Sequence, residues 1–296
     1  MPIPTTDSSF LLAAADMGPA WGISSTGVHK YLRENRLPTS TVGNRSYLAA
    51  SQARSALIAR GFKFQHRVIC MQMLKGGVGK TTTALNIGIR ASMYGARVLM
   101  LDLDQQANLS FALGLEDEKQ AVWADVLEGK CSAKSIVKHL TSHLHIIPSN
   151  LNNSVLDKIL MSAKRNTALG ISQCLAPITH DYDLIIIDTA PNLSAINTAA
   201  ACASDIVLLP VNPDKFSFDG LAKTFADLQE IQSEFSREFD VKVLFTKFDG
   251  RETSSHALLK TCLAEYGEVM LKSFVRTSSD FKNVIRTGKT IFSHKG

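Results

Sequence analysis

The sequence lacks the features that mark several broad classes of protein. No apolar run among its 296 residues reaches the roughly 18 residues that a membrane-spanning helix needs. Residues 1–10 contain no basic segment followed by an apolar core, so we expect no secretory signal. Internal repeats and low-complexity segments are also missing. With 45% hydrophobic and 20% charged residues, the chain has the composition of a globular protein, for which we expect a cytoplasmic location and no membrane contact.

Cysteine pairs with the spacing of metal or redox sites are missing as well. The five cysteines are scattered without a C-x-x-C pair, at Cys70, Cys131, Cys174, Cys202 and Cys262. An odd, unpatterned set is typical of a reducing compartment, where cysteines serve as small buried apolar residues. We therefore expect no metal or redox role for them.

Positive charge is concentrated at the start of the chain. The formal net charge is +5, and residues 1–66 hold seven lysines and arginines against three acidic residues, a net charge of +4. This excess indicates a module that faces a polyanion.

The sequence from residue 67 onward alternates short apolar runs with longer amphipathic segments. The runs are rich in Val, Ile and Leu without polar alternation, which is typical of strands buried on both faces of a parallel sheet. They span 67–74, 97–104, 143–149, 183–190, 205–211, 242–248 and 269–275. Strand–helix alternation predicts a doubly wound α/β domain over 67–296, with ligands at the carboxyl ends of the strands.

Residues 1–66 have a different pattern. A serine-capped helix is predicted over 24–35, followed by two short strands around Gly43-Asn44 and a helix in "ASQARSALIAR". This order of helix, turn, basic helix, hairpin and helix predicts a small winged helix-turn-helix-like DNA-binding domain over 1–66. A small dimerisation domain with solubilising charges is the alternative.

The stretch "LKGGVGKTTT" at 74–83 is nearly a phosphate-binding loop. The usual pattern is G-x-x-x-x-G-K-[ST]; Leu74 stands in place of its first glycine, and Lys75 is an additional lysine. Backbone N–H groups and the following helix would surround the phosphates of a nucleotide. Lys80 would reach the β- and γ-phosphates, and Thr81 would bind Mg²⁺. The predicted nucleotide-binding residues are Gly76, Gly77, Val78, Gly79, Lys80, Thr81 and Thr82.

Three aspartates are predicted at the carboxyl ends of strands, beside this loop. Asp188 ends the run "DLIIID" and is expected to bind Mg²⁺ directly or through water. Asp102 and Asp104 end another run. A carboxylate at Asp104 could orient the attacking water while Asp102 supports the metal. Alternatively, Asp102 only caps the next helix.

Together these motifs resemble the ParA/MinD ATPases, which carry a deviant Walker A loop. The resemblance covers about residues 67–292, with the motifs in family order: "KGGVGKTT", "DLDQQAN", "LIIIDTAPNLS", "LLPVNPDKFSFDGL", "FTKFDGRETSS" and "VRTSSDFKNVIRTGKTIF". It implies ATP and Mg²⁺ as ligands and a homodimer that forms on ATP binding. By analogy, Lys75 contacts the ATP of the partner subunit, so the expected catalytic residues are Lys75, Lys80 and Asp104. The chain departs from the family at Met73-Leu74 and at Gln105, and neither departure removes a ligand.

Within this family the sequence is most similar to the DNA-partition branch, ParA proper. Cluster cysteines, long insertions, a terminal amphipathic helix and a tyrosine-rich tail, which mark other branches, are missing. A basic stripe near the C-terminus is expected to bind duplex DNA without sequence specificity, with Arg276 the strongest candidate among Lys272, Arg276, Lys282, Arg286 and Lys289. A solvated charged face is the alternative.

The N-terminal module supplies the second set of candidate DNA contacts. The recognition helix would present Ser24, Ser25, Thr26, His29, Lys30 and Arg33, and the wing would present Arg45. We therefore expect an ATPase that partitions plasmid or chromosomal DNA on the nucleoid, is stimulated by a centromere-binding ParB-type protein, and represses its own operon. The alternatives are a repressor that senses nucleotide and a positioning ATPase for a non-DNA cargo.

Overall fold

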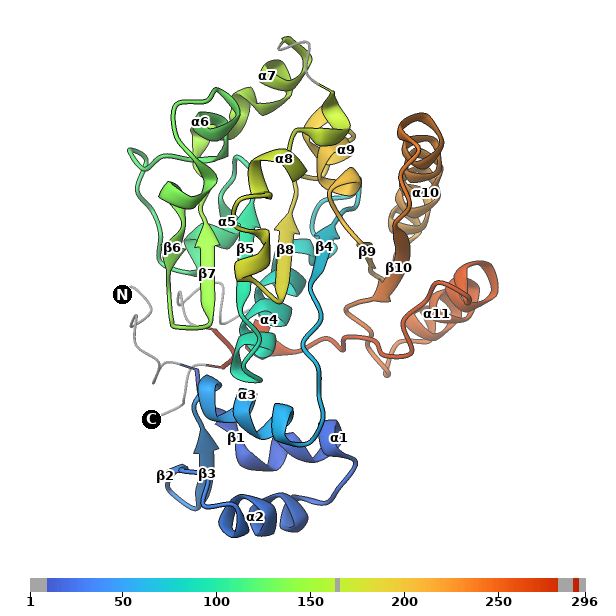
Figure 1. Cartoon of the computed structure of the whole chain (residues 1–296). Coiled ribbons are helices and arrows are strands. Elements are labelled where there is room, and N and C mark those ends of the chain that lie inside the picture. Colours follow the sequence, from blue (N-terminus) through green and yellow to red (C-terminus); the bar gives the residue numbers. More distant parts are fainter. Residues whose placement is uncertain (1–9, 163–165, 282–289, 293–296) are drawn as a thin grey trace.

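The structure is a computed structural model that describes residues 10–162, 166–281 and 290–292. Lys282, Arg286 and Lys289, three members of the predicted basic stripe, lie outside the described residues. Two sheets organise the described chain, one of seven strands and one of three (Figure 1).

The larger sheet has the strand order β10-β9-β4-β8-β5-β7-β6. All of its neighbouring pairs are parallel except β6 and β7, which are antiparallel. A doubly wound, mostly parallel sheet is thereby confirmed. Its strands are β4 Arg67–Met71, β5 Val98–Asp102, β6 Lys138–His139, β7 Leu144–Ile147, β8 Leu184–Asp188, β9 Ile206–Val211 and β10 Asp240–Phe245.

The segment predicted as a strand at 269–275 forms only two isolated bridges beside the sheet. Met270 bridges to Val243, and Arg276, just after the predicted run, bridges to Phe248. Residues 271–274 between the two bridges are exposed. This part of the run therefore has no second apolar face to bury, and a continuous ladder does not form.

Helices cover both faces of the larger sheet (Figure 1). Successive strand residues point to opposite faces: Leu99 and Leu101 belong to one core cluster, whereas Val98 and Met100 belong to the other. The first cluster packs under α6 to α10, and the second under α4 and α5. These helices are α4 Lys80–Met93, α5 Asn108–Ala112, α6 Trp123–Leu127, α7 Leu156–Ser162, α8 Ser172–Leu175, α9 Ala195–Cys202 and α10 Lys215–Phe235, followed by α11 Thr253–Tyr266.

The N-terminal elements form a compact unit around the three-stranded antiparallel sheet, in which β3 pairs with both β1 and β2. Ser24 caps the second helix by accepting a hydrogen bond from the backbone N–H of Gly27 at 3.2 Å. The hairpin turns at Gly43, where φ is +57°. The predicted basic helix, hairpin and final helix are thus present. The elements are β1 Leu12–Ala13, α1 Met17–Trp21, α2 Ser25–Glu34, β2 Ser40–Val42, β3 Arg45–Leu48 and α3 Ala50–Ala59.

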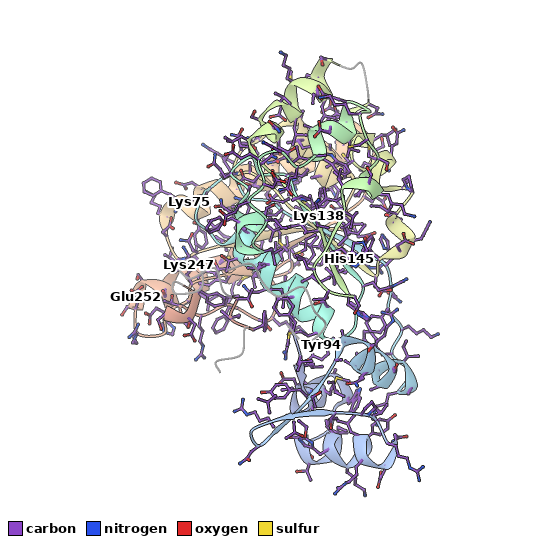
Figure 2. All side chains as sticks on the ribbon, turned by 90° about the vertical axis from the view of Figure 1, so that its left-hand side faces the viewer. Lys75, Tyr94, Lys138, His145, Lys247 and Glu252 are labelled. Atoms are coloured by element: carbon purple, nitrogen blue, oxygen red, sulfur yellow. The ribbon has the colours of Figure 1, made fainter. Side chains whose placement is uncertain are left out.

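The N-terminal unit packs on the far end of α4. Met17 and Leu57 lie in the same core cluster as Met93. The Arg90 guanidinium pairs with the Asp16 carboxylate at 2.8 Å, and the Tyr94 hydroxyl (labelled in Figure 2) donates to the Asp16 carbonyl at 2.7 Å. Removal of the whole N-terminal unit would therefore expose part of the core that it shares with α4.

A buried carboxylate ties the same junction together. The Asp183 side chain, 8% exposed, accepts hydrogen bonds from Arg54 at 2.6 Å and from Arg97 at 3.0 Å. Arg54 also donates to the Gly95 carbonyl at 2.7 Å and lies over the Phe64 ring. Burial alone would raise the pKa of Asp183, but the hydrogen bonds from Arg97 and Arg54 outweigh it and hold this pKa well below its ordinary value.

The variant Asp183→Asn is expected to lower the free energy of unfolding by about 2–3 kcal/mol, since it leaves two guanidinium groups without their counter-charge. The loss is smaller than for a fully buried pair because Arg97 is 45% exposed. In the wild type, the stabilisation by the ionised Asp183 side chain is fully present above the ordinary carboxyl pKa. It is lost as the pH falls from that value through the lower pKa of Asp183 in the folded state. Urea unfolding at pH 7 measures the effect, with Asp181→Asn at a neighbouring exposed carboxylate as the control; equal stability of both variants would contradict it.

All five cysteines lie in the described ranges and form no disulfide; three of them are buried and two are partly buried. Within the described ranges, no helix has the length and apolar character that crossing a membrane requires.

Candidate nucleotide-binding site

The loop between β4 and α4 has an open backbone surface. Gly77 and Gly79 have φ values of +75° and +99°, a region that side chains other than glycine rarely adopt. A Cβ atom added at Gly77 would meet no heavy atom within 4 Å outside the adjacent residues, so there is open space on that side of Gly77. α4 begins directly after the loop, and its first turn points unpaired N–H groups toward this space.

Lys80 is buried at the floor of the site, with an exposed fraction of 7%. Its ammonium donates to the Met73 carbonyl at 3.2 Å. Burial lowers the pKa of Lys80, while the charges of Asp188 and Asp104 act in the opposite direction. The structure thus brings the predicted phosphate-binding lysine together with two of the predicted acids.

Asp188 ends β8, which lies between β4 and β5, and its register partners are Met71 and Asp102. Among the described residues, neither of its buried carboxylate oxygens has a well-formed hydrogen bond. Burial and the neighbouring charge of Asp102 raise the pKa of Asp188 to about 8, although Thr81 and Lys80 favour the ionised form. Buried acceptors of this kind beside a threonine hydroxyl are suited to a hard divalent cation.

Asp102 is also fully buried, but its oxygens already have partners. It accepts hydrogen bonds from the Ser110 N–H at 2.9 Å, the Ser110 hydroxyl at 2.7 Å and the Asp104 N–H at 3.2 Å. Burial raises its pKa to about 7 despite these hydrogen bonds. This geometry favours the alternative in which Asp102 fixes the start of α5, and its metal role stays a prediction.

Asp104 lies beyond the end of β5 and is 6% exposed. One carboxylate oxygen accepts from the Gln106 N–H at 2.9 Å, and its backbone carbonyl accepts from the Ser149 hydroxyl at 2.7 Å. Within the described part of the chain, no donor forms a hydrogen bond with the second carboxylate oxygen. A carboxylate that is anchored at one oxygen in this way is able to orient a water molecule with the other.

Lys75 lies at the rim of the loop, away from the buried acids. Its ammonium pairs with the carboxylate of Asp214, which begins α10. Sequence reasoning missed Asp214 and also missed Lys247, whose ammonium donates to the Gly77 carbonyl at 2.6 Å. Asp214 lies just after the parallel strand β9, and Lys247 lies just after β10. The rule that ligands bind at the carboxyl ends of such strands, which predicted Asp188, could therefore also have found these two residues. Lys75 and Lys247 lie on the same side of the molecule in Figure 2.

The described candidates for DNA contact are all exposed and fall into two groups. Lys272 and Arg276 belong to the irregular segment beside β10, where the Arg276 guanidinium lies over the Phe274 ring. The remaining candidates lie at the N-cap of α2, on α2 and at the start of β3: Ser24, Ser25, Thr26, His29, Lys30, Arg33 and Arg45.

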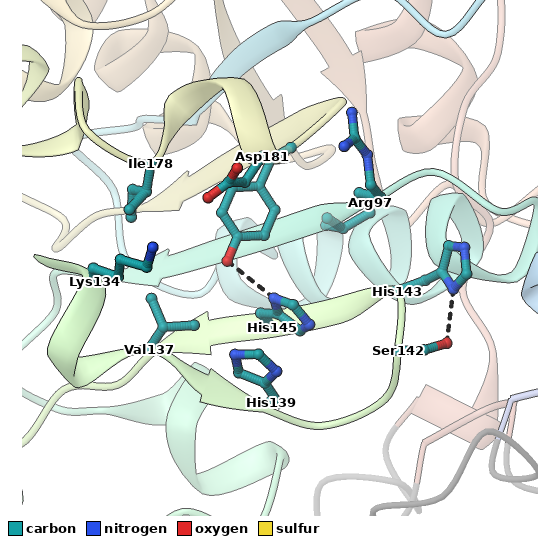
Figure 3. Close-up of a pocket in the computed structure, with 11 residues that line it drawn as sticks. Arg97, Lys134, Val137, His139, Ser142, His143, His145, Ile178 and Asp181 are labelled. Atoms are coloured by element: carbon teal, nitrogen blue, oxygen red, sulfur yellow. Dashed lines mark hydrogen bonds between the residues drawn. The ribbon is translucent and has the colours of Figure 1, made fainter.

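Figure 3 shows a pocket of about 320 Å³. Its lining includes Arg97 and Val98 at the amino end of β5, so it lies at the ends of the strands opposite to the phosphate loop. His139 and His145 are register partners on β6 and β7, and their rings stack with centroids 3.8 Å apart. A ring nitrogen of His145 shares a hydrogen bond with the Tyr182 hydroxyl at 2.9 Å. Among the described residues, no group of three or more His, Cys, Asp or Glu side chains is arranged to hold a metal ion.

His145 is expected to titrate near pH 4, since burial, followed by the positive charges of His139 and His143, lowers its pKa from 6.5 to about 4. The folded state therefore binds fewer protons than the unfolded state between these values, and stability falls as the pH drops through this window. The imidazole proton resonances measure the midpoint by NMR. His139→Gln should raise it, and a wild-type midpoint near 6.5 would contradict the prediction.

The parallel sheet, the glycine-rich loop before α4 and the strand-end acids define a P-loop nucleoside triphosphatase. A family model described as "AAA domain" (AAA_31) matches residues 66–241, and the chain belongs to this family. It is a P-loop ATPase of the ParA/MinD type. Its relatives include the sporulation initiation inhibitor protein Soj of Bacillus subtilis, 28% identical over 76% of this chain and 90% of that protein.

Two further known proteins are similar to this chain. The chromosome partitioning protein ParA of Caulobacter vibrioides is 29% identical over 68% of this chain and 77% of that protein. A crystal structure described as cobyrinic acid a,c-diamide synthase from Mycobacterium smegmatis, with bound ADP and magnesium, is 25% identical. It superposes with a TM-score of 0.68 over 75% of this chain and 90% of that one. Its fold is therefore close to the fold of this chain.

Proposed function

We propose that the chain is a Mg²⁺-dependent ATPase that hydrolyses ATP to ADP and phosphate in order to partition DNA. The observation that carries this proposal is the placement of Lys80 and the buried Asp188 carboxylate behind an open glycine loop. Backbone N–H groups of the loop would bind the phosphates, as would Lys80, and Thr81 with Asp188 would hold Mg²⁺. When bound, the ion would supply charge neutralisation at the phosphates.

The chain's own residues would arrange the reaction in three ways. Lys80 compensates negative charge on the phosphates from the floor of the site. Because Lys80 is buried, its electrostatic interaction with the phosphates is stronger than it would be in water. Asp104 orients the attacking water with its second carboxylate oxygen. Lys75, at the exposed rim, supplies positive charge to the nucleotide of a second copy in an ATP-dependent homodimer.

The dimer would bind nucleoid DNA through exposed cations that contact backbone phosphates. Lys272 and Arg276 are the described candidates, and such contacts give sequence-independent binding that weakens with salt. A ParB-type centromere-binding protein on the cargo would stimulate hydrolysis and release the dimer. The name of the Caulobacter vibrioides relative, a chromosome partitioning protein, supports partition as the biological role.

The N-terminal unit would act as a winged helix-turn-helix that represses the chain's own operon. Its support is the exposed α2 with Lys30 and Arg33, next to a hairpin that carries Arg45. Because this unit shares a core with α4, point variants are a cleaner test than deletion. Lys30→Ala combined with Arg33→Ala should weaken binding to DNA from upstream of the gene at least about 10-fold, with ATPase activity unchanged. Unchanged affinity in a gel-shift assay would contradict it.

An ATPase assay tests the proposed function as a whole. The full chain is assayed alone, with duplex DNA, with the product of the adjacent downstream gene, and with both, and DNA binding is repeated at several salt concentrations. We expect slow basal hydrolysis that rises most when both are present, and a binding constant that falls steeply with salt. Negligible hydrolysis under all conditions would favour a repressor that senses nucleotide. Stimulation by a partner without DNA binding would favour a non-DNA cargo.

A further inference from the structure

The environment of Lys75 differs from that of an ordinary loop lysine. Its side chain is 28% exposed, and its ammonium pairs with the Asp214 carboxylate, whose side chain is 33% exposed. The ammonium also lies 5.9 Å from the centroid of the Phe216 ring. An ammonium has three donors, and one carboxylate cannot use all of them. The remaining donors are available at the rim of the site.

Asp214 is itself held in place from the other side. It is the N-cap residue of α10, and it accepts a hydrogen bond from the Ser217 N–H at 2.9 Å. Its other oxygen accepts from the Ser217 hydroxyl at 3.3 Å. Burial alone would raise the pKa of Asp214, but the hydrogen bonds from Lys75 and Ser217 outweigh it and lower this pKa. The carboxylate therefore stays ionised near neutral pH and has little rotational freedom.

The helix that carries Asp214 is fixed against the start of the phosphate loop. The Leu74 N–H donates to the Thr224 hydroxyl at 3.3 Å. α10 approaches closely at Gly220, where an added Cβ would lie 3.4 Å from the Met73 methyl carbon and 3.6 Å from the Lys75 Cβ. These contacts hold the backbone at Lys75 close to α10, the helix that Asp214 caps.

The surface next to this ion pair is apolar and open. Phe216 is 75% exposed, although it lies only two residues after Asp214. A large apolar side chain that is exposed beside a fixed charge is typical of a surface that a second protein covers.

We propose that Asp214 is a positioning residue: it holds the Lys75 ammonium at the rim of the phosphate loop, with its free donors directed toward a second copy of the chain. This inference rests on the proposed function, in which Lys75 contacts the nucleotide of the partner subunit. A flexible lysine would lose side-chain entropy on reaching across an interface. The carboxylate fixes the lysine beforehand, and the contact forms without that additional cost.

Asp214→Asn tests the proposal, because it removes the charge at constant size. We expect maximal partner-stimulated turnover to fall about 10-fold to 100-fold, with KM and the affinity for a fluorescent ADP analogue within about twofold of wild type. Asp214→Glu should restore part of the turnover. Asp219→Asn, at an exposed carboxylate one turn further along α10, is the matched control and should match wild type.

A double-mutant cycle with Lys75→Ala separates positioning from a general structural role. If Asp214 acts through Lys75, then Asp214→Asn causes no further loss of turnover in the Lys75→Ala background. An equal fold-loss of turnover in both backgrounds, or wild-type turnover in Asp214→Asn, would overturn this inference but would leave the proposed function unaffected. Failure of the wild-type chain to dimerise with ATP would overturn the proposed function and this inference with it.

Discussion

Lys80→Ala is expected to abolish measurable ATP hydrolysis and to weaken nucleotide binding by at least about 100-fold. The wild-type ammonium is buried and interacts electrostatically with Asp188 and Asp104. Its removal takes away a charge-assisted donor to the phosphates, and it also leaves two buried acids without their nearby cation. Fluorescence titration with a labelled nucleotide and a phosphate-release assay measure the two effects.

Two controls make this result interpretable. Lys80→Met keeps the length of the side chain, so a shared loss in both variants assigns the effect to charge instead of to a cavity. Circular dichroism melting shows whether each variant folds. A folded Lys80→Ala variant that hydrolyses ATP at the wild-type rate would exclude the assigned phosphate site.

Lys75→Ala should give a different result, in which nucleotide binding is retained and ATP turnover is lost. We expect nucleotide affinity within about twofold of wild type, because the Lys75 ammonium pairs with Asp214 at the rim and does not contact the buried floor of the site. We expect loss of the ATP-dependent dimer and a decrease of about 1000-fold in stimulated hydrolysis, the range known for a charge supplied in trans.

The control for this variant is Lys223→Ala, an exposed lysine on α10 that should dimerise and hydrolyse as wild type does. Sedimentation velocity with a slowly hydrolysed ATP analogue gives the oligomeric state of each protein. Full stimulated activity in Lys75→Ala would remove the basis for a function of this lysine across a dimer.

The central sheet and the floor of the site were predictable from local patterns. Continuous apolar runs gave the parallel strands, and the rule that ligands bind at their carboxyl ends led directly to Asp188. The loop was recognisable because its glycines and Lys80 are adjacent in sequence. Such features depend on neighbouring residues, so one sequence was sufficient to find them.

Features that depend on distant parts of the chain were not predictable in this way. The Asp102 carboxylate accepts a hydrogen bond from Ser110 on the next helix. The ion pair between Arg54 and Asp183 joins residues that are 129 positions apart. The contact of Asp214 with Lys75 depends on α10 packing on the loop across 139 positions. The apolar run at 269–275 was predicted as a strand, but its exposed residues form only isolated bridges. In each case packing between elements decides the outcome, and residue spacing does not encode it.

Sedimentation velocity on the wild-type chain, without nucleotide and with ATP and Mg²⁺, tests the central claim most directly. The proposed mechanism predicts a monomer that becomes a species of twice the mass only when ATP and Mg²⁺ are present, and that returns to monomer as ATP is hydrolysed. A single species of unchanged mass under both conditions, in protein that demonstrably binds ATP, would contradict a dimeric nucleotide switch.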